Sequence, residues 1–384
     1  MPHVHWRDLV GQERVKDTLA RAMAGDALGH AYLFCGDAGV GKFQAALELS
    51  LALLCNDSAA VPCYRCESCR QVLHHAHPDF QMVLPVCLQK EHKASDGKLS
   101  ERGWGYLDEV CRGKVADPYR LNGPAGIATI PVEWIREVNH SILRGSVKQR
   151  RNAAIICGID LMKKESANAM LRTLEEPPEN TVIILITERP YAVLPTIVSR
   201  CQIMRFGYVD SGLMTEALGA RYGMPSDDAR VQNAVRCAEG SLGKARQLLE
   251  QPLDELLAEA ETLLELCAAT DWNETAVRLD ALLSQRLDFG REYGRVERIL
   301  TYVIYRIRDS FLRKAGVSGK YIREAFASHA AAGASCGPDT ASRILAVCQD
   351  AIDAVRARGN VQLVLTTFLL SMMEIFHGKE QPAR

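Results

Sequence analysis

The stretch Gly36-Asp37-Ala38-Gly39-Val40-Gly41-Lys42-Phe43 follows the apolar run 31–35 and leads into a segment with the apolar periodicity of a helix. A strand, a glycine-rich loop and a helix in this order are typical of a phosphate-binding loop. Its three glycines let backbone N–H groups surround a phosphate, and the start of the helix adds partial positive charge. Lys42 is then placed to reach the outer phosphates of ATP or ADP. The alternative is a glycine turn that holds no ligand.

The loop departs from a working ATPase at the position after the lysine. A hydroxyl side chain there binds Mg²⁺, but the sequence has Phe43. The apolar run 153–159 predicts a strand, which in such ATPases ends in acidic residues that hold Mg²⁺ and activate water. Here Cys157 and Gly158 occupy those positions, and Asp160 lies further along. The sequence therefore predicts a loop that is poorly equipped for hydrolysis, and it leaves nucleotide binding itself in doubt.

The composition is that of a globular protein with two or three domains, since 47% of the 384 residues are hydrophobic and 24% are charged. A formal net charge of -1 creates no global basic field that would attract nucleic acid. No apolar run approaches the ~20 residues of a membrane-spanning helix, and the first residues lack the apolar core of a signal peptide. We therefore expect a cytoplasmic protein without membrane contact.

Four of the thirteen cysteines fall close together, at Cys55, Cys63, Cys66 and Cys69. Two Cys-x-x-Cys steps that share Cys66 cannot all be disulfides without strain, whereas four thiolates suit a tetrahedral Zn²⁺. An iron–sulfur cluster is the rival interpretation, and free surface thiols are a third. Because no ligand position is open, zinc would be structural and would hold a segment that has no core of its own.

Apolar, β-branched runs predict a five-stranded parallel sheet with helices on both faces. The expected strands span residues 30–35, 79–84, 153–159, 181–187 and 202–206. After these strands the pattern is helical, first as short helices up to residue 250 and then as longer apolar stripes to the end. The expected fold is therefore α/β followed by all-α.

Residues 86–128 interrupt this pattern with a polar, turn-rich segment. A loop of this length inside a compact domain is unusual, and is either functional or mobile. We interpret it as an insertion, in which no residue carries a chemistry that the sequence identifies.

A group of basic residues follows the helix that is expected to open at Pro131. It comprises Arg144, Lys148, Arg150 and Arg151. Such a cluster can contact the phosphate backbone of a nucleic acid. The alternative is a solvated loop whose charges face water.

Several segments together resemble a known family. They are Leu9-Val10-Gly11-Gln12-Glu13, residues 30–34, the phosphate loop, the four cysteines, His77-Pro78-Asp79, residues 168–178, Ser199-Arg200-Cys201 and residues 360–370. In these segments the chain resembles the AAA+ subunits of the bacterial DNA polymerase III clamp loader, and most the delta-prime type. The resemblance is specific over 6–85 and 129–250, only architectural from 251 onward, and absent in 86–128.

The resemblance implies three domains. Residues 1–208 would be an AAA+ nucleotide-binding-like domain with a zinc module at 55–69 and the insertion at 86–128. Residues 209–250 would be a small helical lid, and residues 251–384 a helical collar through which family members oligomerise.

The resemblance also implies a role. Members of the family form a five-subunit ring that opens the sliding clamp and places it on primed DNA, so gamma/tau and delta subunits, the clamp and DNA are the implied partners. Arg200, in the Ser-Arg-Cys motif, would be an arginine finger supplied in trans to a neighbour's ATP. Thr187 would be the polar residue that senses phosphate. Gly243 stands where motor subunits carry a sensing arginine in the lid.

Three departures from the motor pattern, at Phe43, at Cys157-Gly158 and at Gly243, imply a non-hydrolysing structural subunit of the DNA polymerase III holoenzyme. Two alternatives stay open. The intact Lys42 loop is compatible with an active ATPase of the gamma/tau type. The cysteine cluster and the basic residues are compatible with a zinc-containing DNA-binding protein.

Overall fold

The computed structural model describes the chain except for residues 1–2, 58–59, 97, 122–127, 148–150, 251–252, 270–271, 285–291, 315, 317–337, 357–358 and 378–384. It divides into two compact units, and the boundary between them falls between Gln247 and Leu248. Each unit is described here by itself.

Among the described residues of the first unit, five strands form one parallel sheet in the order β4-β5-β6-β2-β7. These strands are β2 (Ala31–Cys35), β4 (Phe80–Val83), β5 (Asn152–Cys157), β6 (Thr181–Thr187) and β7 (Gln202–Arg205). In the register, Cys35 lies beside Thr187 and Arg205, so the carboxyl ends of the three strands meet where the phosphate loop begins. Two short strands, β1 (His3–Val4) and β3 (Ala60–Val61), pair separately.

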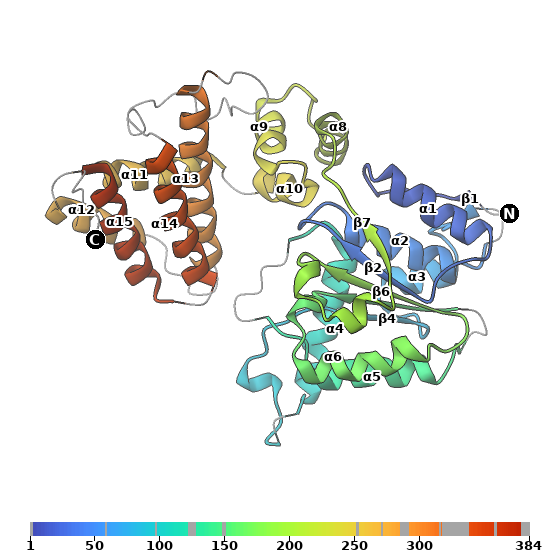
Figure 1. The fold of residues 1–384 in the computed structure, drawn as a ribbon. Helices are drawn as coiled ribbons and strands as arrows, with labels where there is room; N and C mark the ends of the chain where they lie inside the picture. Colours follow the sequence, from blue (N-terminus) through green and yellow to red (C-terminus); the bar gives the residue numbers. More distant parts are fainter. Residues whose placement is uncertain are drawn as a thin grey trace. The chain divides into compact units, whose positions relative to one another are not determined.

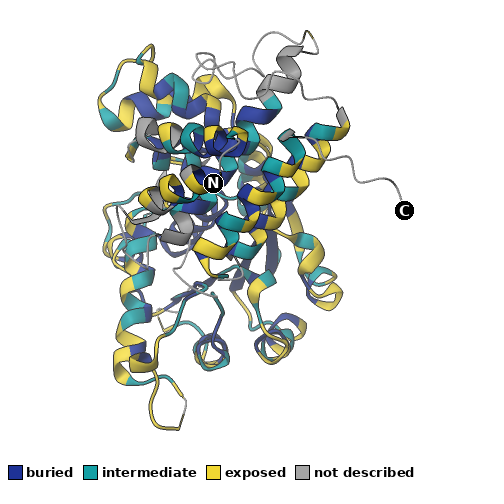
Figure 2. Ribbon diagram, turned by 90° about the vertical axis from the view of Figure 1, so that its left-hand side faces the viewer, coloured by how far each residue is buried: buried dark blue, intermediate teal, exposed yellow. Residues whose placement is uncertain are grey.

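Helices cover both faces of the sheet, since all seven residues of the central strand β6 are buried. The helices of this unit are α1 (Glu13–Ala24), α2 (Lys42–Leu54), α3 (Glu67–Leu73), α4 (Glu101–Ala116), α5 (Val132–Leu143), α6 (Lys164–Glu175), α7 (Pro195–Val198), α8 (Ser211–Tyr222), α9 (Ala229–Ala238) and α10 (Leu242–Glu250), which reaches into the second unit. Their arrangement around the sheet is visible in Figure 1. Figure 2 shows that buried residues line the inner sides of the helices, and exposed residues their outer sides. The α/β plus all-α class predicted from the sequence is confirmed.

The segment 86–128 differs from the loop that we expected. It contains the helix α4, which begins after Ser100, whose side chain accepts a hydrogen bond from the N–H of Gly103. Leu107, Cys111 and Val115, spaced four residues apart, are buried on one side of it. The polar residues on its other side made the segment look like a loop. The capping residue Ser100 and the four-residue spacing of the apolar residues are the signals that predict the helix.

The second unit is helical in its described part. Its helices are α11 (Leu253–Ala268), α12 (Trp272–Ser284), α13 (Glu292–Lys314), α14 (Pro338–Arg356) and α15 (Val361–His377). They pack against one another, with α13 against α14 and α11 against α15. Leu300, Val303, Ile344, Leu369 and Met372 are among its buried side chains. Between α13 and α14, residues 315 and 317–337 lie outside the described part of the chain.

No helix among the described residues is both long and apolar enough to span a membrane. The assignment of residues 209–250 to a lid separate from 1–208 stays a prediction, because residues up to Gln247 group with the sheet in one unit.

Candidate functional site

The phosphate-loop sequence connects β2 to α2 as a tight turn. Gly39 and Gly41 have φ angles of 74° and 107°, which residues other than glycine rarely adopt. Gly41 directly precedes the first residue of α2, so the loop delivers its N–H groups to the start of a helix. The local geometry is that of a phosphate-binding loop.

Lys42 is buried and turned toward its own loop. Its ammonium group donates hydrogen bonds to the backbone oxygens of Gly36 and Asp37, at 2.6 Å each. Burial lowers the pKa of Lys42, and the nearby Glu188 opposes this effect. The loop thus satisfies its lysine with carbonyl groups of the protein itself.

Phe43 lies in the position where a hydroxyl group would hold Mg²⁺, and its side chain is buried. The ammonium group of Lys114, from α4, lies over its ring at 5.1 Å from the centroid. A positive charge from the segment 86–128 therefore stands beside the residue that replaces the metal ligand. The sequence alone does not predict a role for Lys114, because no pattern in it connects α4 to the phosphate loop.

The end of β5 supplies no carboxylate at the two positions where an ATPase carries acids. Burial raises the pKa of the Cys157 thiol to about 12, although Lys114 and Lys42 lie near enough to lower it. Gly158 has a φ of 65°, and Asp160 follows in a short 3₁₀ helix, Ile159–Leu161. With Phe43, these residues do not fit a magnesium ion bound to a nucleotide, which requires oxygen ligands.

Thr187, at the end of β6, is engaged by the protein itself. Its hydroxyl donates to the carboxylate of Asp160 at 2.7 Å and accepts from the backbone N–H of Arg189 at 3.0 Å. The structure therefore brings together Asp160 and Thr187, which the sequence places on two different strand ends.

The phosphate loop is contacted by a residue that precedes α8 and by the start of α10, which lie in the same unit. Ser241 donates its hydroxyl hydrogen to the backbone oxygen of Ala38 at 2.7 Å, and the N–H of Gly243 donates to Gly39 at 3.0 Å. The phenol of Tyr208 donates to the carboxylate of Asp37 at 2.6 Å. The loop is thus bound to the start of α10 through backbone and side chain.

Arg200 lies between α7 and the edge strand β7. Its guanidinium pairs with Glu175, the last residue of α6, with 2.8 Å between Nη2 and Oε1, and also donates to the backbone oxygen of Thr196. About a third of the side chain is exposed, at 34%. The group is therefore held in place from within the chain and still accessible from outside it.

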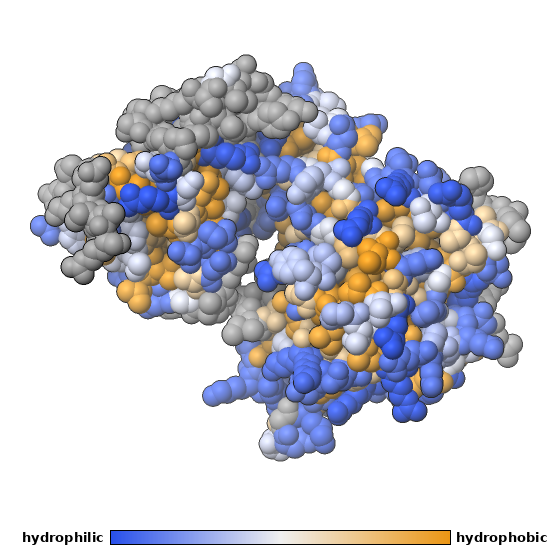
Figure 3. Space-filling view, in the orientation of Figure 1, coloured by the Kyte–Doolittle hydropathy of each residue, from blue (hydrophilic) through white to orange (hydrophobic). Residues whose placement is uncertain are grey.

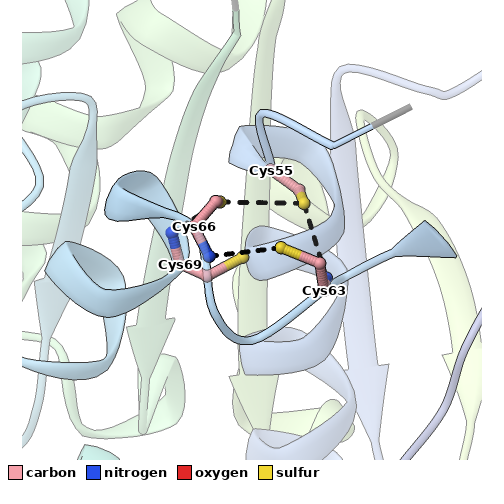
Figure 4. A group of neighbouring side chains, drawn as sticks. All are labelled: Cys55, Cys63, Cys66 and Cys69. Carbon is pink, nitrogen blue, oxygen red and sulfur yellow. Dashed lines mark hydrogen bonds between the residues drawn. The ribbon is translucent and has the colours of Figure 1, made fainter. Parts of the chain in front are cut away.

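The four cysteines converge from three segments, as Figure 4 shows: Cys55 follows α2, Cys63 and Cys66 lie in the loop after β3, and Cys69 lies in α3. Their Sγ atoms all lie within 4.8 Å of one another. For Zn–S bonds of about 2.3 Å, tetrahedral geometry requires sulfur atoms somewhat less than 4 Å apart. The cluster fits a single metal ion with four sulfur ligands.

Backbone N–H groups donate hydrogen bonds to two of the four sulfur atoms. Asn56 and Cys69 donate to the sulfur of Cys66, at 3.5 and 3.4 Å, and Asp57 and Cys63 donate to that of Cys55. Burial alone raises the pKa of Cys66, but the backbone donors Asn56 and Cys69 and the side chains of Cys63 and Cys69 outweigh it and lower the pKa to about 6. Burial raises the pKa of Cys55 and Cys69, so Cys66 ionises before these two. A thiolate that forms readily is the species that binds zinc.

A family model described as DNA polymerase III, delta subunit, matches residues 11–210. The match covers 200 of the 384 residues, which is just over half of the chain. The chain belongs to the DNA polymerase III delta subunit family. The matched stretch includes the phosphate loop, all four cysteines and Arg200, and it ends at the start of α8.

The curated relatives are replication proteins by name. The DNA polymerase III subunit delta′ of Bacillus subtilis is 29% identical over 204 residues, which are 53% of this chain and 50% of that protein. The tau subunits of Bacillus subtilis and Escherichia coli are 26% and 28% identical, over 65% and 64% of this chain and 38% and 32% of their own. The chain thus spans half or less of these relatives' length.

A solved structure also aligns with the chain. It is a DNA polymerase III gamma subunit-related protein from Thermotoga maritima, with a TM-score of 0.46 and 13% identity, and the alignment covers 93% of this chain and 99% of that one.

In this member of the family, the described part of the basic cluster is paired. Arg151 forms an ion pair with Asp26, and Arg144 lies 3.8 Å from Glu137. Lys148 and Arg150 lie outside the described residues. Contact of this cluster with DNA stays a prediction.

Proposed function

We propose that this chain is a clamp-loader subunit of DNA polymerase III that hydrolyses no ATP itself and completes the ATP site of a neighbouring subunit with Arg200. One combination of features carries the proposal. No side-chain oxygen is present at Phe43 after the phosphate loop or at Cys157 and Gly158 at the end of β5, while the arginine of the Ser-Arg-Cys motif is ordered and reachable from outside. A guanidinium supplied in trans stabilises the charge that develops on a transferred phosphoryl group.

The surface around Arg200 supports a subunit contact. Ile203 on β7 is 44% exposed and Leu194, just before α7, is 39% exposed. Figure 3 shows apolar side chains at the surface over this edge of the sheet. Exposed apolar residues beside a positioned cation suit the face of another protein.

The proposed partners follow from the relatives' names. They are gamma/tau and delta subunits. The family resemblance adds, through the complex, the sliding clamp and primed DNA in the cytoplasm. In this assembly the α11–α15 unit would serve as the oligomerisation collar. Zinc at Cys55, Cys63, Cys66 and Cys69 would be structural, since four sulfur ligands leave no open coordination position.

Reconstitution tests the role of Arg200. The chain is assembled with its own gamma/tau and delta subunits, clamp and primed DNA, and ATP turnover is measured. Arg200→Ala should lower ATP turnover at the one site that it completes by roughly a thousandfold. The turnover of the whole complex should then fall by the fraction that this site contributes. Arg230→Ala, which removes an exposed guanidinium from α9, is the matched control. Unchanged turnover in an assembled Arg200→Ala complex would refute the finger.

A second candidate is an active ATPase of the gamma/tau type, which the intact Lys42 and the similarity to tau subunits favour. ATP turnover by the isolated chain, abolished by Lys42→Ala, would establish it and displace the first proposal. We expect no such turnover, because both positions that hold magnesium lack oxygen ligands.

A further inference from the structure

Residues 114–121, here called the closing segment, run from the last turn of α4 to Leu121 and lie against the phosphate loop. Tyr119 is 6% exposed. Its phenol accepts a hydrogen bond from the N–H of Val10 at 3.1 Å and donates to the backbone oxygen of Asp8 at 3.3 Å. A Cβ placed on Gly41 would lie 3.2 Å from the phenol oxygen. The phenol therefore packs against the phosphate loop at Gly41.

Two charged side chains of the closing segment complete its attachment. Asp117 forms an ion pair with Arg246 of α10, with 2.6 Å between Oδ1 and Nη1, and Arg246 is buried. Lys114 donates to the backbone oxygen of Arg120 at 2.7 Å and lies over the ring of Phe43. One segment thus touches α10 and the first turn of α2.

Gly243 shows how tightly the three parts meet. A Cβ at this position would lie 2.6 Å from the backbone oxygen of Tyr119 and 2.9 Å from the Cα of Gly39. Both are backbone atoms, which cannot move away as the end of a side chain can. The absence of an arginine here therefore has a steric reason, because the phosphate loop, α10 and the closing segment are in backbone contact.

We propose that the closing segment takes the place of a nucleotide in this subunit: it binds α10 to the phosphate loop from within the chain and excludes a triphosphate from the loop. In a nucleotide-dependent subunit, ligand contacts join these parts, and here Tyr119, Asp117 and Lys114 do so permanently. This inference deepens the proposed function, since it explains why a subunit without hydrolysis keeps an ordered loop.

Hydrogen exchange of the full chain tests the attachment. In the variant Asp117→Asn/Tyr119→Phe, peptides covering 8–12 and 240–247 should exchange roughly tenfold faster, as expected for the loss of an ion pair and a buried hydrogen bond. The variant Asp108→Asn/Tyr106→Phe makes the same two changes on α4 away from the loop, and should leave these peptides unchanged. Unchanged exchange in the first variant refutes the attachment. If that variant does not fold, Tyr119→Phe alone should accelerate exchange at Val10.

Millimolar ATP, with and without Mg²⁺, tests the exclusion. We expect no protection of residues 36–42 in the wild-type chain. ATP-dependent protection there would overturn the proposal, whereas the role of Arg200 would still be decided separately by the reconstituted complex.

A pair of glycine substitutions tests the close packing. Gly243→Ala should lower the thermal midpoint and accelerate exchange in 36–42, because its Cβ meets backbone atoms. Gly113→Ala on α4, where nothing lies within 4 Å of the new Cβ, should leave the midpoint unchanged or raise it. An equally stable Gly243→Ala protein with unchanged exchange would contradict the packing.

Discussion

The guanidinium of Arg200 and the carboxylate of Glu175 form an ion pair with 2.8 Å between Nη2 and Oε1. Glu175 ends α6, and Arg200 precedes β7, so the pair joins two segments that lie 25 positions apart (200 minus 175). Glu175 is 49% exposed as a side chain, and such pairs contribute little to stability. The ion pair instead orients Arg200, because the carboxylate restricts the direction in which the guanidinium points.

The first prediction concerns this orientation. Glu175→Gln should change the free energy of unfolding by less than about 1 kcal/mol and lower ATP turnover of the reconstituted complex by less than Arg200→Ala does. In an Arg200→Ala background the same substitution should have no further effect on turnover. An equal loss in both backgrounds would mean that Glu175 acts independently of Arg200.

The second prediction concerns the four cysteines. Elemental analysis of the purified chain should find one zinc per molecule, and Cys63→Ser should lower that content and the thermal midpoint, because the metal holds the loop between α2 and α3. Cys87→Ser, a cysteine outside the cluster, should keep the metal. Iron with visible absorption would favour the iron–sulfur alternative, and the absence of any metal would favour free thiols.

The third prediction concerns Phe43. Phe43→Ser restores a hydroxyl where Mg²⁺ is bound in ATPases, but it should yield no ATP turnover, since Cys157 and Gly158 still supply no carboxylate. Loss of the buried ring, which is 6% exposed, should cost about 3–5 kcal/mol of stability. Urea denaturation and a turnover assay check the two parts, and measurable turnover in this single variant would refute our account of the site.

The fourth prediction concerns Glu48, a fully buried carboxylate on α2. It accepts hydrogen bonds from the N–H of Asp8 at 2.7 Å and from Gln44 at 2.8 Å. Burial nevertheless raises its pKa above the ordinary value of 4.5. The folded state then holds the proton more firmly than the unfolded chain, so this contribution to stability is complete below pH 4.5 and is lost as the pH rises through the folded-state pKa.

Glu48→Gln should therefore gain stability relative to the wild type as the pH rises above 4.5, by about 1.4 kcal/mol for each unit by which the pKa is raised. Urea unfolding at several pH values measures this difference. Glu165→Gln, at an exposed position on α6, is the control and should show no comparable trend. A pH-independent difference for Glu48→Gln would contradict the buried charge.

The sequence by itself determined the five-stranded sheet, and it predicted the phosphate loop and the four-cysteine cluster as candidate sites. Runs such as 182–186, apolar along their whole length, predict strands that are buried on both faces, as in a parallel sheet covered by helices. The four cysteines and the loop 36–43 are local patterns, in which spacing alone fixes which residues can meet.

Only the tertiary structure decided what the phosphate loop touches. Tyr119 and Gly243 lie far from Gly39 in the chain, and no periodicity connects a tyrosine hydroxyl to Val10 or an aspartate at 117 to Arg246. The same holds for Glu175 and Arg200. Local patterns report which face of an element is apolar, but contacts between elements depend on how the whole chain packs, and such packing leaves no signal in the order of one sequence.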